Sequence, residues 1–413
     1  MVSTGDIASF AANVTYDRLP ENVREATKRQ LLDAVGAGIR SRGVSQTDSI
    51  YRAVDSATGT CGLWGSHSTA SAADAAMANA AAIESGHGPT FLSPTLTAPS
   101  SSIAAVLAVA ESNGVSGEET LAGLATAFEI HGELAWNAPL DGFHPATHGT
   151  VAATAGVGRT IGLTETKLAH AIGTAASQVT VSIDDKGFTP LVAGLGASSA
   201  IRACSLARGG VEAPDSIGAS YGWHDLFGPF NLDFDPGCER VFDVAITPYD
   251  AHPYGQSTIE AAVELTAESP IDPADIERIT VETFEEAVPT LDTERIAAAL
   301  VDRELFVYRG DRIHLEPIVE ATEIVDTDEF ADRVEDGLFP VRITVQAHGG
   351  TEYEAIADRF DGHPTTAASW GTVEDKFRAL SGDMYDRDRQ NVIVETARSF
   401  EAETATELVR LLD

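Results

Sequence analysis

Lysine is scarce in this sequence, and positive charge is scarce with it. The 413 residues include 27 Lys and Arg against 63 Asp and Glu, which gives a formal net charge of −36. The lysines are Lys28, Lys167, Lys186 and Lys376. Nucleic acids and anionic membrane surfaces are held mainly by clustered Lys and Arg, so this composition excludes both as expected partners.

Cysteines and long apolar runs are also few. Cys61, Cys204 and Cys238 lie far apart, their number is odd and no CxxC spacing occurs, so neither a disulfide framework nor a zinc knuckle is predicted. The most apolar stretch, residues 103–110, is stopped by Glu111 and is too short to span a bilayer. No signal peptide or membrane-spanning helix is expected, and we predict a cytoplasmic protein with reduced, mostly buried cysteines.

What the sequence does have is acid, spread along its whole length rather than gathered in one tail. At molar salt the Debye length falls to about 3 Å, so the repulsion among many like charges is screened. The acidic composition, with arginine preferred to lysine, is typical of adaptation to such conditions. We therefore expect a halophilic protein.

The length predicts two or three domains, and 43% hydrophobic residues suffice for a core. A first helix is predicted over 20–42, with Pro20 at its start and Gly43 just past its end. Small residues crowd the segments that follow, and they let helix axes approach closely. Further helices are predicted over 72–84, 100–112, 117–136, 147–161, 164–179 and 192–208.

The pattern changes near residue 244, where alternating β-branched residues predict strands with more polar helices between them. A helical pattern returns from residue 372 to the end. The predicted fold is therefore mostly α, with a large all-α helical domain of residues 1–243 and 370–413 and a smaller α+β lid domain of residues 244–369. The predicted strands are 279–284, 341–347 and 353–356, and the predicted helices of the lid are 273–276, 293–301 and 328–334.

Several segments resemble the MmgE/PrpD family, in order along the chain. They read LWGSHSTASAADAAMANAAAIESG, GFHPATHGTVAATAGVGRTIGL, TPLVAGLGASSAIRACSLARGG and VEDKFRAL, with the best agreement between Leu63 and Gly210. The resemblance implies a large helical domain, an α+β lid, a homodimer, and neither a metal nor another cofactor. It also implies that a proton is abstracted next to a carboxylate before water or carbon dioxide leaves, or before the proton returns.

Gly142, Phe143 and His144 match the family's Gly-Phe-His motif, which makes His144 the predicted catalytic acid or base. An imidazole exchanges a proton near neutral pH, as this chemistry requires. Taken alone, a histidine in a glycine-rich loop is more often a surface or capping residue. The neighbouring His148 is expected only to be a residue at a helix start.

Other positions of the family's site carry uncharged residues in this sequence. The paired aspartates are absent, and Ala98 and Pro99 occupy the place of a His-Pro pair. A methyl group cannot transfer a proton. Thr189 and Thr247, the candidate substrate-binding residues, occupy the places of two lysines. A threonine hydroxyl donates one hydrogen bond but supplies no charge, so each contact with a carboxylate is expected to be weaker.

Four nearby residues can compensate for these losses. Lys186, three residues before Thr189, and His87, near the place of the lost aspartates, are candidate catalytic residues. Tyr249 and His252 are further candidates for substrate binding. The alternatives stay open, since Lys186 also fits a solvated ion pair, His252 an ordinary loop residue and Tyr249 a packing role.

Two functions remain in competition. The first is a cofactor-independent lyase or isomerase that acts on a small di- or tricarboxylate, with a dehydratase of the 2-methylcitrate type as the favoured form. The second is a family member that has lost catalysis and serves as a binding or assembly protein, because a fold does not imply a function. Polar groups that refill the site would favour the first, and apolar or obstructed space would favour the second.

Overall fold

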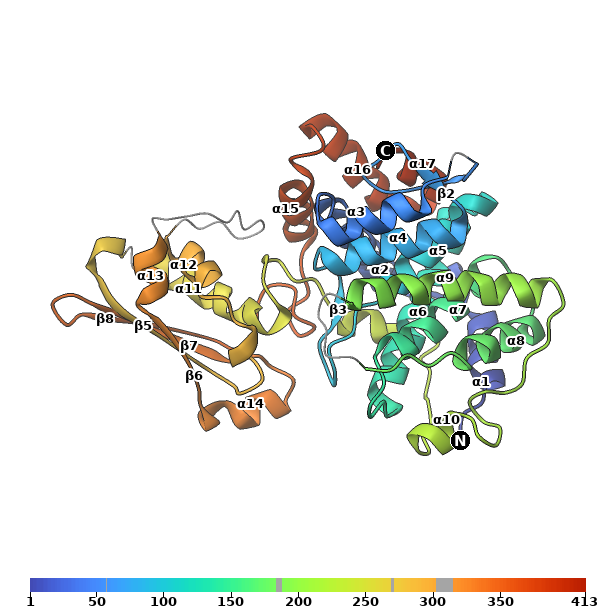
Figure 1. The fold of residues 1–413 in the computed structure, drawn as a ribbon, viewed down its shortest axis with the longest axis horizontal. Helices are drawn as coiled ribbons and strands as arrows, with labels where there is room; N and C mark the ends of the chain where they lie inside the picture. The colour runs from blue at the N-terminus through green and yellow to red at the C-terminus, as the bar shows by residue number, and fades with distance from the viewer. Residues whose placement is uncertain (57, 183–187, 269–270, 302–314) are drawn as a thin grey trace. The chain divides into compact units, whose positions relative to one another are not determined.

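The described chain forms two compact units (Figure 1). Unit 1 comprises Met1–Val244 and Val373–Asp413, and unit 2 comprises Ala245–Thr372. The computed structural model describes residues 1–56, 58–182, 188–268, 271–301 and 315–413.

Unit 1 is built mainly from helices. Its C-terminal segment packs on its N-terminal part, with α16 against α2 and α17 against α5. The helices are α1 (Thr4–Asn13), α2 (Glu21–Arg40), α3 (Ser45–Val54), α4 (Ala72–Ser85), α5 (Ser100–Asn113), α6 (Gly117–Asn137), α7 (Ala146–Thr160), α8 (Glu165–Ala176), α9 (Thr189–Arg208), α10 (Trp223–Phe227), α15 (Trp370–Ser381), α16 (Arg387–Arg398) and α17 (Ala405–Arg410).

Many helices of unit 1 begin at the capping residues that the sequence offers. The hydroxyls of Ser71, Ser116 and Thr164 accept hydrogen bonds from backbone N–H groups three residues later, at the starts of α4, α6 and α8. The helices predicted over 72–84 and 117–136 are confirmed as α4 and α6, and each ends one residue later than predicted.

Small residues bring α6 and α7 together. A Cβ atom on Gly156 would lie 2.8 Å from the carbonyl oxygen of Gly123, and one on Gly123 would lie 2.9 Å from the carbonyl oxygen of Gly156. Both distances are shorter than real Cβ contacts, so the two backbones meet at this pair of glycines. A larger side chain at either position would push the helices apart.

The long helix α9 lies in the core of unit 1, where it packs against α4, α5, α7 and α8. Among the described residues, α9 is the one helix that is long and apolar enough to cross a membrane by length and composition, and most of it is buried within the unit. The core helix of a soluble protein passes the same test.

The predicted all-α character of the large domain is wrong. Unit 1 contains the antiparallel pair β1 (Cys61–Gly62) and β2 (Thr69–Ala70), together with β3 (Thr90–Phe91). Strands of two residues are too short to show the alternation by which a strand is recognised in a sequence. A further short strand, β4 (Val244–Ala245), lies where the chain passes from unit 1 into unit 2.

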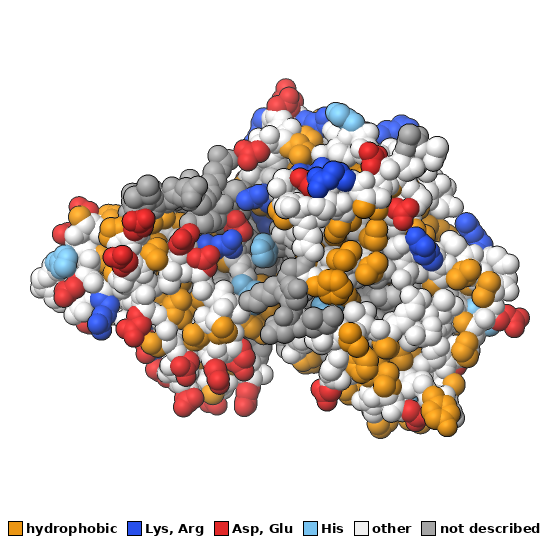
Figure 2. Space-filling model, viewed as in Figure 1, with side chains coloured by type: hydrophobic (Ala, Val, Ile, Leu, Met, Phe, Trp, Pro, Cys, Tyr) orange, Lys and Arg blue, Asp and Glu red, His pale blue; other side chains and the backbone are white. Residues whose placement is uncertain are grey.

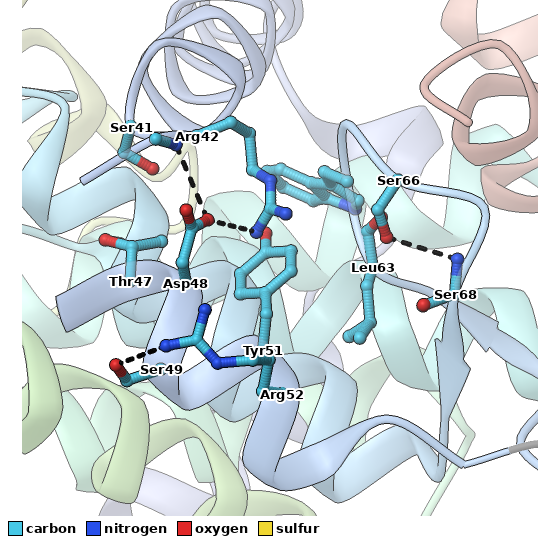
Figure 3. A network of polar contacts seen from close by, with 12 residues as sticks. Ser41, Arg42, Thr47, Asp48, Ser49, Tyr51, Arg52, Leu63, Ser66 and Ser68 are labelled. Carbon is cyan, nitrogen blue, oxygen red and sulfur yellow. Dashed lines mark hydrogen bonds and ion pairs between the residues drawn. The ribbon is translucent and has the colours of Figure 1, made fainter. Parts of the chain in front are cut away.

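Polar contacts hold the loop between β1 and β2 against the helices. Oδ1 of the buried Asn79 accepts hydrogen bonds from the Tyr51 hydroxyl at 3.0 Å and from the Trp64 N–H at 3.1 Å. The Arg42 guanidinium lies over the Tyr51 ring, 3.9 Å from its centroid (Figure 3). Arg42 also lies 3.2 Å from a carboxylate oxygen of Asp48. This network fixes the loop without a longer sheet.

Unit 2 is organised around a four-stranded sheet with the order β6-β5-β7-β8. β5 and β6 are parallel, and the other neighbours are antiparallel. α11 packs on β7 and β8, and α12 packs on α11. The elements are α11 (Gln256–Glu268), β5 (Ile276–Thr283), α12 (Thr293–Val301), α13 (Glu316–Glu320), β6 (Thr322–Asp326), α14 (Ala331–Glu335), β7 (Val341–Ala347) and β8 (Glu352–Ala357).

Acidic side chains are frequent on the face of unit 2 that Figure 2 shows, with few Lys and Arg between them. The segment from the end of β6 through α14 is the densest part. Because these carboxylates face solvent, dissolved salt can screen the repulsion among them. The exposed acids of this segment are Asp326, Asp328, Glu329, Asp332, Glu335 and Asp336.

Candidate active site

His144 lies in a loop that is held by backbone contacts with the segment after α8. Its N–H donates to the Thr180 carbonyl at 2.8 Å, and Phe143 forms an antiparallel bridge with Val181. The Thr147 hydroxyl accepts a hydrogen bond from the Thr180 N–H at 3.1 Å. The position of the histidine is therefore set both by the start of α7 and by the segment that leads toward α9.

The imidazole of His144 is oriented by the first turn of α7. Its Nδ1 accepts a hydrogen bond from the Ala146 N–H at 3.1 Å. Partial burial lowers the pKa of His144 below its ordinary value, so the ring is neutral at pH 7. An acceptor at Nδ1 places the ring proton on Nε2, which has no hydrogen-bond partner among the described residues. The ring is thus set up to donate a hydrogen bond through Nε2.

The N-terminal parts of α5, α7 and α9 meet at Ser101. The Ser101 hydroxyl donates to the Ala193 carbonyl of α9 at 2.7 Å. Cβ atoms on Gly149 of α7 and Gly196 of α9 would lie 3.9 and 3.2 Å from the same hydroxyl oxygen. Neither α5 nor α9 begins with a side-chain cap. Uncapped N–H groups and the positive ends of helix dipoles favour an anion in such surroundings.

A buried histidine of α6 reaches the same end of unit 1. His131 Nε2 lies 3.0 Å from Oγ1 of Thr97, the residue before Ala98. Its Cε1 lies 3.5 Å from the place of a Cβ atom on Gly149. Burial lowers the pKa of His131 to about 4, so this imidazole is neutral. A ring from α6 therefore stands close to the position where the resemblance expects a histidine and the chain has Ala98.

His148 is the third residue of α7, which confirms its predicted place at a helix start. It is also buried, and neither ring nitrogen has a hydrogen-bond partner among the described residues. Burial, and secondarily the neighbouring His131, lower the pKa of His148 to about 3. Nδ1 of His131 is unpartnered in the described chain as well. Buried polar groups are usually bonded to protein or ordered water, so these nitrogens mark a polar centre within the helices.

Glu84 brings a carboxyl group to this end of unit 1. It is half-buried near the end of α4, and its Oε2 accepts a hydrogen bond from the hydroxyl of Ser100, the first residue of α5, at 2.7 Å. Burial raises the pKa of Glu84 to about 7, against the opposing effect of the Ser100 hydrogen bond. A carboxyl that titrates near neutrality is suited to proton exchange. Glu84 could not be singled out from the sequence, because a glutamate at the end of a helix is usually solvated.

The predicted site residues of unit 1 lie in different surroundings. Thr189 is the half-buried first residue of α9. Because α7 and α9 pack together, Thr189 and His144 lie at or just before the starts of two neighbouring helices. His87 is exposed after the end of α4, and its carbonyl accepts a hydrogen bond from Lys376 Nζ at 3.3 Å. Lys186 falls outside the described residues.

The predicted residues Thr247, Tyr249 and His252 belong to unit 2. Thr247 is buried. The Tyr249 hydroxyl donates to a carboxylate oxygen of Glu260, and Tyr249 is 8% exposed. His252 Nδ1 accepts a hydrogen bond from the Tyr254 N–H at 3.3 Å. These two hydrogen bonds lie within the segment around the start of α11.

Within the described ranges, no group of three or more His, Cys, Asp and Glu side chains is arranged to hold a metal ion. The three cysteines are free and buried. Burial raises the pKa values of Cys61 and Cys204 to about 12, so both are thiols at neutral pH.

Comparison with known proteins gives two findings. The MmgE/PrpD N-terminal domain profile matches residues 5–232. The chain is also similar to cis-aconitate decarboxylase of Mus musculus, with 25% identity over 462 aligned positions that cover 99% of this chain and 93% of that protein. Glu84, His144 and Thr189 lie inside the matched domain, and the similarity to the decarboxylase extends over unit 2.

Proposed function

The chain belongs to the MmgE/PrpD family, and on that premise we propose that it is a cofactor-independent lyase or isomerase acting on a small di- or tricarboxylate. The proposed reaction begins with abstraction of a proton from the carbon next to a carboxylate, and a dehydratase of the 2-methylcitrate type is its favoured form. Family membership and the similarity to a cis-aconitate decarboxylase support lyase-type chemistry on small carboxylates.

The orientation of His144 is the observation that carries this proposal. Proton abstraction next to a carboxylate builds negative charge on the carboxylate oxygens, and a positioned N–H stabilises that charge. Because Nδ1 of His144 accepts a hydrogen bond from the Ala146 N–H, the proton of the neutral ring is on Nε2. Burial keeps the pKa of His144 low, so the ring remains a neutral donor across the neutral range.

Hydrogen-bond donors must also hold the substrate carboxylates, and we propose Thr189 and Thr247 for this role. A hydroxyl without charge gives a weaker bond than a lysine ammonium. The double variant Thr189→Lys, Thr247→Lys is therefore expected to lower the KM for di- and tricarboxylates. The other proposed residues are His87 and Lys186 for catalysis, and Tyr249 and His252 for binding.

We also propose that the protein is a cytoplasmic, halophilic homodimer. The charge of −36 supports adaptation to molar salt, and free buried cysteines are consistent with a reducing compartment. Leu195 and Leu206 on α9 are 48% and 46% exposed, which suits contact with a second copy. Light scattering in molar KCl should give twice the mass of the chain, and a monomer at micromolar concentration would contradict the dimer.

A substrate screen in molar KCl tests the proposed function. The protein is incubated in D₂O with 2-methylcitrate, citrate, cis-aconitate or an epimerisable dicarboxylate, and the products are followed by proton NMR. Loss of water, loss of carbon dioxide, or deuterium uptake next to a carboxylate is the expected result with at least one of these acids.

Absence of any reaction or exchange with all four acids would contradict the proposed function. That result would favour the alternative of a family member without catalysis, which the replacements at Ala98, Thr189 and Thr247 motivate. Under that alternative, the Thr189→Lys, Thr247→Lys variant would gain activity that the wild type lacks.

A further inference from the structure

We propose that Glu84 is the general base of this site, an assignment that rests on the function proposed above. Because His144 acts as a donor, another group must accept the substrate proton. An imidazole base at Nε2 would need its remaining proton on Nδ1, where the Ala146 N–H already points. Glu84 supplies a carboxylate at the same end of unit 1.

Three other fully or partly buried carboxyl groups of unit 1 have structural partners that compensate their burial. Burial raises the pKa of each of Asp33, Glu111 and Glu129. Asp33 lies 2.6 Å from Lys376 Nζ. Glu111 accepts a backbone N–H with both oxygens, and Glu129 accepts two backbone N–H groups. These three carboxyl groups therefore hold parts of the fold together.

Glu84 lacks compensation of that kind. Among the described residues, its one hydrogen-bond partner is the hydroxyl of Ser100, and it has neither a cation nor a backbone N–H. A half-buried carboxyl with so little structural support costs stability. Titratable groups kept in such surroundings are typical of functional sites.

The position of Glu84 connects it with the helix starts around His144. Its partner Ser100 is the first residue of α5, and Ser101 follows. The Ser101 hydroxyl lies 3.9 Å from the place of a Cβ atom on Gly149, in the first turn of α7. α7 itself begins two residues after His144. Glu84 is therefore linked through Ser100 and Ser101 to the first turn of α7, the helix that follows His144.

In the proposed reaction, the Glu84 carboxyl group first accepts a proton from the substrate and later gives it back. The Glu84 carboxylate takes the proton from the carbon next to the substrate carboxylate, and the C–H electron pair forms an enediolate whose oxygen accepts the Nε2–H of His144. In a dehydration, the enediolate forms a C=C bond as the C–O bond on the neighbouring carbon breaks. The Glu84 carboxylic acid then gives its proton to the departing hydroxyl, which leaves as water. In an isomerisation the proton returns to carbon instead.

The surroundings of Glu84 allow both of its forms at neutral pH. Burial raises the pKa of Glu84 to about 7, and the Ser100 hydroxyl is the group that opposes this rise. The charged groups near α4 are engaged elsewhere or lie beyond its end. They are Asp33 of α2 with Lys376 of α15, Asp48 of α3 with Arg42, Asp74 of α4 with Arg202 of α9, Glu111 at the far end of α5, and His87 in the turn after α4.

The pH profile of kcat/KM, measured on the full chain with the acid found in the screen, tests this assignment. In the wild type, kcat/KM should rise as the pH increases through about 7, because the carboxylate is the base. Glu84→Gln retains an acceptor for the Ser100 hydroxyl and should fold, but it should lose about 100-fold or more in kcat/KM. Ser100→Ala removes a bond that favours the carboxylate, so the acidic limb should move to higher pH.

Glu111→Gln is the matched control, because burial raises the pKa of Glu111 to about 7 as well while its oxygens hold a backbone N–H. It should keep the wild-type pH profile. An active wild type with a Glu84→Gln variant of unchanged kcat/KM and profile would overturn the base assignment and leave the proposed function intact. A wild type with neither turnover nor deuterium exchange would remove the proposed function, and the base assignment with it.

A measurement that needs no substrate gives an independent answer. Infrared difference titration of the wild type against Glu84→Gln isolates the carboxyl stretch of this one residue. We expect its midpoint near pH 7, and a midpoint at the ordinary glutamate value of 4.5 would overturn the assignment.

Discussion

Lys376 of α15 and Asp33 of α2 form an ion pair inside unit 1, with Nζ 2.6 Å from Oδ1 and side chains that are 4% and 0% exposed. The same Nζ donates to the His87 carbonyl at 3.3 Å. This lysine therefore ties the C-terminal segment both to an N-terminal helix and to the turn that follows Glu84.

Removing Lys376 should destabilise unit 1, because the buried Asp33 carboxylate loses its partner. Lys376→Met leaves Asp33 without its cation, and we expect the free energy of unfolding to fall by about 3–5 kcal/mol, measured by denaturant titration in molar KCl. The double variant Asp33→Leu, Lys376→Met should recover most of that loss, since well-packed apolar pairs often replace buried ion pairs at little cost. Wild-type stability in the single variant would show that the pair does not stabilise unit 1.

The buried pair His131 and His148 should make stability depend on pH. Burial lowers their pKa values to about 4 and about 3. Below pH 6.5 the unfolded chain therefore binds protons at these histidines that the folded chain does not bind. Their contribution is complete above pH 6.5 and is lost as the pH falls, by up to about 1.4 kcal/mol per pH unit for each histidine. Glu84, Glu111 and Glu129 act in the opposite sense between pH 4.5 and about 7, because burial raises their pKa values.

The comparison of variants isolates the histidine contribution from that of the carboxyl groups. Denaturant titrations at pH 7 and pH 5 give the change in the free energy of unfolding between the two pH values. That change should be more favourable at pH 5 in His148→Gln than in the wild type, because the loss due to His148 is absent. The exposed His67 provides the control, and His67→Gln should behave as the wild type does. An unchanged pH dependence in His148→Gln would mean that His148 does not resist protonation in the folded state.

Because α6 and α7 approach so closely, adding a single methyl group at their contact should destabilise the protein. In Gly156→Ala, the new Cβ would lie 2.8 Å from Ala127 Cβ and from the Gly123 carbonyl oxygen, so the melting temperature should fall with a loss of about 1–3 kcal/mol. Gly371→Ala in α15 is the matched control, because the nearest atom to its Cβ would be a serine hydroxyl at 3.4 Å. Equal stability of the two variants would contradict the tight packing.

Salt should stabilise the protein strongly. With a charge of −36, repulsion acts over roughly 10 Å at 0.1 M salt and over about 3 Å at 1 M, so the melting temperature should rise by on the order of 10 °C between 0.1 M and molar KCl. Neutralising Asp332, Glu335 and Asp336 of the exposed segment as Asn, Gln and Asn should reduce that rise. A melting temperature independent of salt would refute the halophilic interpretation.

Helices and central strands were predictable because their signals are local. The alternation from Val341 to Ala347 is visible in the sequence and appears in β7 as alternating buried and half-buried positions. β6 escaped prediction because its residues are only partly buried and its parallel pairing, Ile279 with Thr322, joins distant segments. The short pair β1–β2 escaped for a similar reason, since its partners are fixed by the buried Asn79 rather than by a pattern.

The candidate site could be predicted only where a motif marks it. Gly142 and Phe143 single out His144, but the tautomer of its ring depends on the Ala146 N–H and is settled by the start of α7. Glu84 and His131 come from other helices, α4 and α6, and bond to Ser100 and Thr97. Their surroundings arise from tertiary packing, which the local sequence does not display.

The central claim is that the Nε2–H of His144 stabilises charge formed next to a substrate carboxylate. His144→Asn is the most informative variant, because Asn Oδ1 can still accept the Ala146 N–H and cap α7 while the ring donor is lost.

The deciding measurement is the rate of deuterium uptake at the carbon next to the carboxylate, in molar KCl, for the wild type, His144→Asn and His67→Ala. We predict a wild-type melting temperature for His144→Asn, a rate reduced by about 100-fold or more, and an unchanged rate for His67→Ala. A wild-type rate in folded His144→Asn would contradict the account.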